Sequence, residues 1–308
     1  MSGRNLAAGA PPAPPHWWEQ RERGSLLLQR LMIWIAFHLG WPAARALLVG
    51  ITAYFFVTSA CSRRASAEFL RRATSRPARM LDVFRHLHAF AATLLESTFL
   101  LARRTEHFRI TVEGLDMLIA ALAKGRGSVL LGAHFGSFEV LRAVARDAPV
   151  AVHPVMYRRA TGRLARTLAA LDPALAAAII DLGTPEAVLS MREAVQRGEI
   201  VAMLADRTVG TEKRVSADFL GAPAEFPAGP LIVTAHLDAP VLLFWGIRTG
   251  PRRYTVVFEP FAERIVLRRG ARADDLRLWV GRYAAKLEAR CRANPFNWFN
   301  FFPFWHQP

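Results

Sequence analysis

A histidine and a glutamate five positions apart form the pattern of greatest chemical interest in this chain. His134 and Glu139 lie within GSVLLGAHFGSFEVL, residues 127–141. A neutral imidazole can take a proton from a hydroxyl group, and a nearby carboxylate can fix its tautomer and stabilise the imidazolium that forms. Residues five apart point in different directions in a continuous helix, so the pair can meet only across a change from strand to turn to helix, which Gly136 permits. The pattern therefore predicts a proton-transfer pair at the end of a strand.

The spacing alone carries little weight, and its position in the chain has to support it. With nine His and 25 Asp plus Glu in the sequence, about one histidine would have an acid at the fifth position by chance. Ligand sites in open parallel sheets lie beyond the carboxyl ends of the strands. Three predicted strands end on polar groups at such positions: His134 after residues 128–133, Arg158 and Arg159 after residues 150–156, and Asp206 with Arg207 after residues 200–205. We expect one site at this edge; a hydrogen-bonded histidine and arginines in surface ion pairs are the alternatives.

Patterns for a covalent or metal-dependent mechanism are absent from the sequence. It contains no Gly-x-Ser-x-Gly elbow, no His-Glu-x-x-His and no phosphate-binding Gly-x4-Gly-Lys. The only two cysteines, Cys61 and Cys291, lie far apart, which argues against a disulfide framework or a cysteine metal cluster. We therefore expect a mechanism without a covalent enzyme intermediate, with no metal and no cofactor, in a reduced compartment.

Strands alternate with helices along most of the chain, and this rhythm predicts an α/β fold with a largely parallel sheet flanked by helices. A long amphipathic helix over residues 77–102 is expected to cover the sheet. The predicted strands are residues 108–112, 128–133, 150–156, 178–181, 200–205, 241–245 and 254–258. The segment 206–227 is long, with basic and apolar side chains, so we expect it to form a lid or substrate loop.

Two apolar blocks, residues 26–39 and 46–60, follow a leader rich in Ala, Gly and Pro. Each block is shorter than the roughly 20 residues that cross a bilayer as a straight helix. Together they predict one kinked span or an in-plane hairpin, with two buried core helices as the alternative. The expected domains are a disordered, basic leader over residues 1–24, membrane-anchor helices over 25–62, the α/β domain over 63–295 and an aromatic tail over 296–308.

Charge and apolar content favour a membrane as partner. The net charge is +15, 52% of the residues are hydrophobic, and the chain holds 20 Phe and 8 Trp. A surface this basic needs a negative partner such as nucleic acid, anionic lipid or an acidic carrier protein. Nucleic acid is disfavoured because the arginines are dispersed and the aromatics cluster at the two ends of the chain. The tail aromatics are expected to hold a cleft at headgroup level, with closure of the core as the alternative: Trp298, Phe299, Phe301, Phe302, Phe304 and Trp305.

The strand, turn and helix that carry His134 and Glu139 resemble the HX4(D/E) signature of glycerolipid-type acyltransferases, and in particular of the late acyltransferases of lipid A biosynthesis. The resemblance covers most of the chain from Trp17 onward. It includes the apolar amino-terminal segment, HFGSFE, VMYRR, GEIVAMLADR, DFLG with the following PAGPLIVTAHLDAPVLLF, and the ending NPFNWF. This ordered set is far more specific than HX4E alone.

The resemblance implies transfer of a fatty acyl group from an acyl carrier protein thioester to a hydroxyl of a membrane lipid. It implies His134 as general base and Glu139 as its orienting partner. Arg158 and Arg207 are then binders of phosphate or of the thioester oxyanion, and Asp206 is a further candidate. It also implies a place at the bacterial inner membrane, with the catalytic domain facing the cytoplasm.

The acceptor is expected to be a lipid A-type or related membrane lipid. WWEQRERGS near the start and FNFFPFW at the end look more like a branch associated with aryl polyene-type lipid pathways. A glycerophospholipid-type or aryl polyene-lipid acyltransferase is therefore the alternative enzyme. The rival from another class is a basic membrane-binding protein in which the HX4E spacing is accidental.

Overall fold

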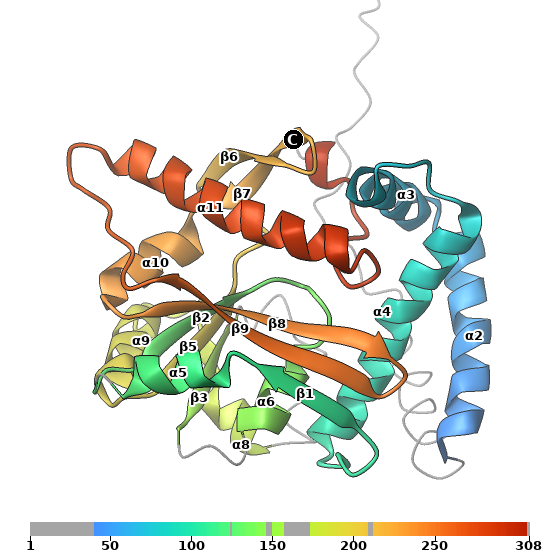
Figure 1. Ribbon diagram of the computed structural model, residues 1–308, viewed down its shortest axis with the longest axis horizontal. Helices are drawn as coiled ribbons and strands as arrows, with labels where there is room; N and C mark the ends of the chain where they lie inside the picture. The colour runs from blue at the N-terminus through green and yellow to red at the C-terminus, as the bar shows by residue number, and fades with distance from the viewer. Residues whose placement is uncertain (1–39, 124, 146–149, 157–172, 209–211, 307–308) are drawn as a thin grey trace, which may run out of the picture.

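A twisted seven-stranded sheet forms the centre of the protein, and helices lie on both of its faces (Figure 1). The computed structural model describes residues 40–123, 125–145, 150–156, 173–208 and 212–306. The strands of the sheet are β1 (Arg109–Glu113), β2 (Ser128–Gly132), β3 (Val152–Met156), β4 (Ile180–Asp181), β5 (Ile200–Leu204), β8 (Val241–Gly250) and β9 (Arg253–Ala262). Their order is β1-β9-β8-β2-β5-β3-β4.

Strand β2 lies at the middle of the sheet and pairs in parallel with β5 on one side and β8 on the other. Strands β3 and β4 extend the parallel part beyond β5, and β1 pairs in parallel with β9. Strands β8 and β9 form an antiparallel hairpin, the one antiparallel pairing among the described strands of this sheet. The predicted largely parallel sheet flanked by helices is confirmed. The pairing also brings the residues that follow β2 and β5 to one edge.

The apolar side chains of β2 pack in two separate cores, because successive side chains of a strand point to opposite faces. The helices that the structure describes around the sheet are α5 (Leu115–Leu122), α6 (Glu139–Ala145), α8 (Pro173–Ala178), α9 (Ala187–Gln196), α10 (Gly229–Leu237) and α11 (Arg272–Ala293). Val129 and Leu131 pack in the core beneath α9, α10 and α11, whereas Leu130 packs in the core with α5 and α6. Burial on both faces is typical of a parallel strand covered by helices.

Among the described residues, three helices precede the sheet: α2 (Gly40–Thr58), α3 (Ala60–Thr74) and α4 (Met80–Leu101). The first predicted anchor block, residues 26–39, lies outside the described residues, and the second, residues 46–60, falls mostly within α2. In the part of the chain that the structure describes, no single helix is long and apolar enough to cross a membrane. Residues 43–58 and 60–74, bent by 96°, meet the criterion only as a pair. The prediction of an apolar helical anchor is therefore not supported by any one described helix.

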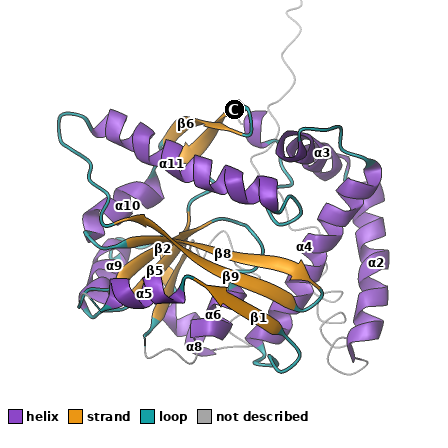
Figure 2. Ribbon diagram, in the orientation of Figure 1, coloured by secondary structure: helices purple, strands orange, loops and turns teal. Residues whose placement is uncertain are grey.

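The predicted lid over residues 206–227 contains a β-hairpin instead of a loop (Figure 2). Strands β6 (Arg214–Phe219) and β7 (Ala222–Pro227) pair antiparallel through a turn at Leu220 and Gly221, which both have positive φ. Phe219 and Leu220 are buried, and Phe219 packs edge-on against Trp298. These apolar side chains belong to the core and are not exposed for a substrate.

The aromatic tail closes the core. Trp298, Phe299, Phe302 and Phe304 are buried, and Trp298 makes edge contacts with Phe69 and Phe304. A short 3-10 helix, η1 (Phe304–His306), ends the described chain. The expectation that these four aromatic side chains face a membrane is wrong; clustered aromatic rings pack equally well in a protein core, and here the core takes them.

Candidate active site

The turn after β2 presents His134 at the carboxyl edge of the sheet. Gly136 has a φ of +64°, and a Cβ at this position would overlap the carbonyl oxygen of Gly246 in β8. The backbone nitrogen of Ser137 donates to that same carbonyl at 2.9 Å, and α6 begins at Glu139. Glycine is therefore required here both by the backbone conformation and by the close approach of a neighbouring strand. The turn is held rigidly against β8.

The imidazole of His134 is paired with the carboxylate of Asp206. The Nδ1 atom lies 2.8 Å from Oδ1 of Asp206, and the backbone nitrogen of His134 donates to Oδ2 at 3.1 Å. Asp206 is fully buried, whereas about a third of the His134 side chain (35%) is exposed. An ionised carboxylate only accepts hydrogen bonds, so Nδ1 carries the proton and Nε2 is left as the basic nitrogen. In the described residues, Nε2 forms no hydrogen bond.

The charges around this pair favour an ionised aspartate beside a neutral histidine. Burial would raise the pKa of Asp206, but His134, through its charge and hydrogen bond, together with Arg207 and Trp298, lowers this pKa to about 2. Burial, followed by the charge of Arg207, lowers the pKa of His134 below its ordinary value, and these effects outweigh the opposing influence of Asp206. A neutral histidine with one open nitrogen is the protonation state that a general base requires near pH 7.

Glu139 does not orient His134 in this structure. Its Oε2 atom accepts hydrogen bonds from Ser97 Oγ at 2.8 Å and Ser137 Oγ at 3.0 Å. The left-handed turn at Gly136 directs the start of α6 toward α4, while the parallel pairing of β2 and β5 sets Asp206 beside His134. The expected His134 and Glu139 contact is thus corrected to His134 and Asp206, and Glu139 ties the turn to α4.

The segment that contains Trp298, near the carboxyl-terminal end of the chain, contacts the His134 and Asp206 pair. The sequence patterns did not assign this segment to the site. The indole nitrogen of Trp298 donates to Asp206 Oδ2 at 2.9 Å. The backbone of the same segment binds both sides of the turn after β2: Phe299 N donates to His134 O at 2.8 Å, and Gly136 N donates to Asn297 O at 2.7 Å. The motif NPFNWF was visible in the sequence, but its composition indicated only aromatic content. Its role in holding the site depends on contacts with residues more than 90 positions away.

A buried histidine on α4 supports this segment in turn. His86 is fully buried, and its Nε2 lies 2.9 Å from the carbonyl oxygen of Trp298. Because a carbonyl only accepts, Nε2 is the protonated nitrogen, and Nδ1 accepts from Ser66 Oγ at 2.8 Å. The chain of contacts from α3 and α4 through Trp298 to Asp206 therefore fixes the carboxylate that faces His134.

The two predicted arginines have different outcomes. Arg207 follows Asp206, and its Nε lies 4.0 Å from Asp206 Oδ2. Its guanidinium donates to the carbonyl oxygen of Phe299 and lies 5.5 Å from the ring centre of Phe302. Arg158 lies outside the described residues. The structure therefore brings His134, Asp206 and Arg207 together and leaves the position of Arg158 undescribed.

The fold and this arrangement define a class of protein. A parallel α/β sheet that holds a carboxylate-oriented neutral histidine at its carboxyl edge suits an enzyme that removes a proton from an acceptor hydroxyl. Within the described residues, no group of three or more His, Cys, Asp or Glu could hold a metal ion.

The sequence comparison supplies the family. A family model described as bacterial lipid A biosynthesis acyltransferase matches residues 31–307, and the chain belongs to this family. The protein is therefore an acyltransferase, and its family supports a lipid A-type acceptor and an acyl donor. No curated protein matches the chain.

Proposed function

We propose that the protein transfers a fatty acyl group from an acyl carrier protein thioester directly to a hydroxyl group of a lipid A-type acceptor, with His134 as general base. The observation that carries this proposal is the 2.8 Å contact between His134 Nδ1 and Asp206, which leaves Nε2 unprotonated on a side chain that is about a third exposed. In this proposal Asp206 orients the ring and stabilises the imidazolium. Trp298 is a positioning residue that acts through Asp206.

The proposed step balances without a covalent enzyme intermediate. The acceptor hydroxyl gives its proton to His134 Nε2 while its oxygen attacks the thioester carbonyl carbon. The carbon–sulfur bond then breaks, and the leaving thiolate takes the proton back from the imidazolium. Arg207 contributes positive charge beside the pair, and both Arg207 and Arg158 are proposed binders of the acceptor phosphate or the developing oxyanion.

The surface of α2 is consistent with work at a membrane lipid. Val49, Tyr54 and Val57 are 49%, 63% and 73% exposed, and the chain carries a net charge of +15. Exposed apolar and basic groups together suit contact with anionic lipid. We propose that the protein lies at the inner membrane with its site toward the cytoplasm, where a carrier-borne donor is available.

Paired substitutions test the assignment of base and partner. His134→Ala should lower the acyl-transfer rate by roughly a hundredfold or more, and Asp206→Asn should also lower it strongly, because an amide favours the wrong tautomer. Glu139→Gln, which should keep its contacts with the two serines, is the matched control and should have a smaller effect. Activity of His134→Ala within about tenfold of wild type would sink the general-base role.

Two further measurements address the mechanism and the acceptor. Mass spectrometry of the protein during turnover should detect no acyl-enzyme, and a trapped one would refute direct transfer. Comparative lipidomics of strains with and without the gene should show loss of one acyl group from a lipid A-type lipid. Loss from a glycerophospholipid or an aryl polyene lipid would reassign the acceptor without changing the chemistry.

A further inference from the structure

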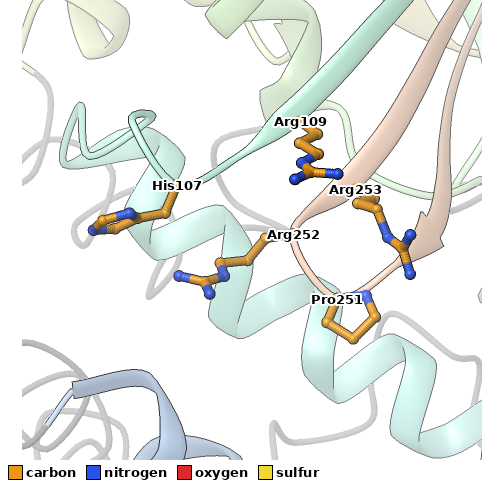
Figure 3. Close-up of a pocket in the computed structure, with 5 residues that line it drawn as sticks. All are labelled: His107, Arg109, Pro251, Arg252 and Arg253. Carbon is orange, nitrogen blue, oxygen red and sulfur yellow. The ribbon is translucent and has the colours of Figure 1, made fainter.

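A hollow of about 360 Å³ lies at the tip of the β8–β9 hairpin, and basic side chains line most of it (Figure 3). Its lining residues are His107, Arg109, Pro251, Arg252 and Arg253. Arg109 begins β1, Arg252 lies in the turn between β8 and β9, and Arg253 begins β9. The register of β1 and β9 pairs Arg109 with Arg253. The fold thus gathers three guanidinium groups from segments far apart in the sequence; we call this surface the basic hollow.

The three arginines of the basic hollow, Arg109, Arg252 and Arg253, form no ion pair with a carboxylate in the described part of the protein. The histidine of the hollow, His107, lies 4.0 Å from the exposed carboxylate of Glu106. The buried carboxylate of Glu96 lies beside the turn, but it accepts two hydrogen bonds from Arg248 at 2.8 Å and one from the backbone nitrogen of Arg252 at 3.0 Å. The negative charge of Glu96 is therefore paired with Arg248 and not with an arginine side chain of the basic hollow. Clustered positive charges without a counter-charge create a strong local potential that attracts an anionic partner.

The basic hollow lies at the same edge of the sheet as His134. Strand β8 runs parallel to β2, and Gly136, two residues after His134, bridges Gly246 of β8. From Gly246 to Gly250, where β8 ends, the strand advances about 13 Å at about 3.3 Å per residue. Adding the spacing between neighbouring strands, the hollow and the base are separated by on the order of 15 to 20 Å.

The directions in which the arginines extend indicate a partner with an extended acidic surface. Arg252 and Arg253 extend to opposite sides of the hairpin turn, and Arg109 lies between them (Figure 3). Such a spread of charge fits an extended acidic surface better than one small anion. A surface that inserts into a bilayer combines basic residues with Trp, Phe or Leu, and none of the five lining residues is of that kind.

We propose that the basic hollow is the docking surface for the acidic carrier protein that delivers the acyl thioester. This inference rests on the proposed function for the identity of the donor. Complementary charge would steer the carrier to the edge where His134 lies, while the thioester itself is bound nearer the base.

Charge reversal separates docking from catalysis. In the variant R109E/R253E, the Kd for acyl carrier protein should rise about tenfold or more, as measured by biolayer interferometry at low salt. The KM for the carrier-borne thioester should rise with it, whereas the KM for the same acyl chain on N-acetylcysteamine should be unchanged. The matched control is R269E/R272E, which alters two exposed arginines that follow the opposite end of β9 in the chain and should leave both values close to wild type.

The outcomes distinguish the two proposals. Equal carrier affinity in wild type and R109E/R253E, or no carrier binding by wild type, overturns the docking surface. Loss of binding to anionic vesicles with carrier binding retained also overturns it and assigns the hollow to lipid. Carrier binding that depends on these arginines, in a protein that transfers no acyl group, supports docking and contradicts the proposed function. If R109E/R253E melts below the control, R109Q/R253Q replaces it in the same comparison.

Discussion

The protonation of His86 predicts a loss of stability in mild acid that a single substitution should remove. His86 is fully buried among aromatic rings, with ring centroids of Phe69 and Phe301 at 5.4 and 4.8 Å. Burial lowers its pKa from 6.5 to about 4, although its hydrogen bond to the Trp298 carbonyl works in the opposite direction. The folded protein therefore holds this histidine neutral at pH values where the unfolded chain protonates it.

The direction and the size of the stability change follow from this difference in pKa. Because the pKa in the folded state is lower than in the unfolded state, the unfolded state binds more protons between pH 6.5 and about 4. Stability is retained above pH 6.5 and falls as the pH drops through this interval. With one pKa unit equivalent to about 1.4 kcal/mol, lowering the pH from 7.5 to 5 should cost about 2 kcal/mol through this group alone.

The assay is denaturant unfolding of wild type and His86→Gln at pH 7.5 and pH 5 under otherwise identical conditions. Glutamine does not titrate in this range and keeps an N–H donor for the Trp298 carbonyl. Wild type should lose about 2 kcal/mol more than the variant between the two pH values, since the other histidines titrate equally in both proteins. Losses that agree within about 0.5 kcal/mol would show that burial does not keep His86 neutral.

Two more predictions concern the segments around the turn at Gly136. Trp298→Phe removes the N–H donor to the carboxylate of Asp206, so the rate of acyl transfer should fall about tenfold or more. The pH midpoint of kcat/KM should rise, because Asp206 then stabilises the imidazolium of His134 more strongly. Trp305→Phe should change neither quantity, and equal pH profiles for the two variants would exclude a positioning role for Trp298. The Gly136→Ala variant should be less stable in thermal unfolding than the Gly198→Ala variant by about 2 kcal/mol or more. Both glycines have positive φ, but only Gly136 lacks room for a Cβ. Equal melting temperatures would contradict the close approach of Gly246 to the turn.

The centre of the fold could be predicted from the sequence because local patterns encode it. The strands before His134 and Asp206 are apolar runs that end on polar residues, and both lie where they were expected. The hairpin of β6 and β7 was missed since its strands are short and contain charged residues, Pro and Ala, which resemble a loop. Its stability comes from packing of Phe219 and Phe226 against the aromatic tail, a contact that no local pattern reports.

The hydrogen-bond partner of His134 also could not be predicted from local sequence patterns. A motif in the linear sequence favours Glu139, because only neighbours in the chain are visible there. The structure selects Asp206 because β2 and β5 are adjacent strands, and residues at adjacent strand ends meet regardless of their separation in sequence. The polar residues at those strand ends were recognisable, but which of them would touch was not. The contribution of Trp298 depended on the same long-range pairing.

The contacts between the Trp298 segment and the turn at Gly136 also have a consequence for the rate of folding. The side chains that hold the site come from His86, His134, Asp206 and Trp298, so its contacts span more than 200 positions of the chain. Such a high contact order delays the loop closures on which the site depends. During synthesis, strands β2 and β5 emerge long before the indole that completes their edge. The nascent domain therefore passes through a stage in which its central strands exist but Asp206 and His134 are not yet held by Trp298, and partly folded stages of this kind are prone to misfolding.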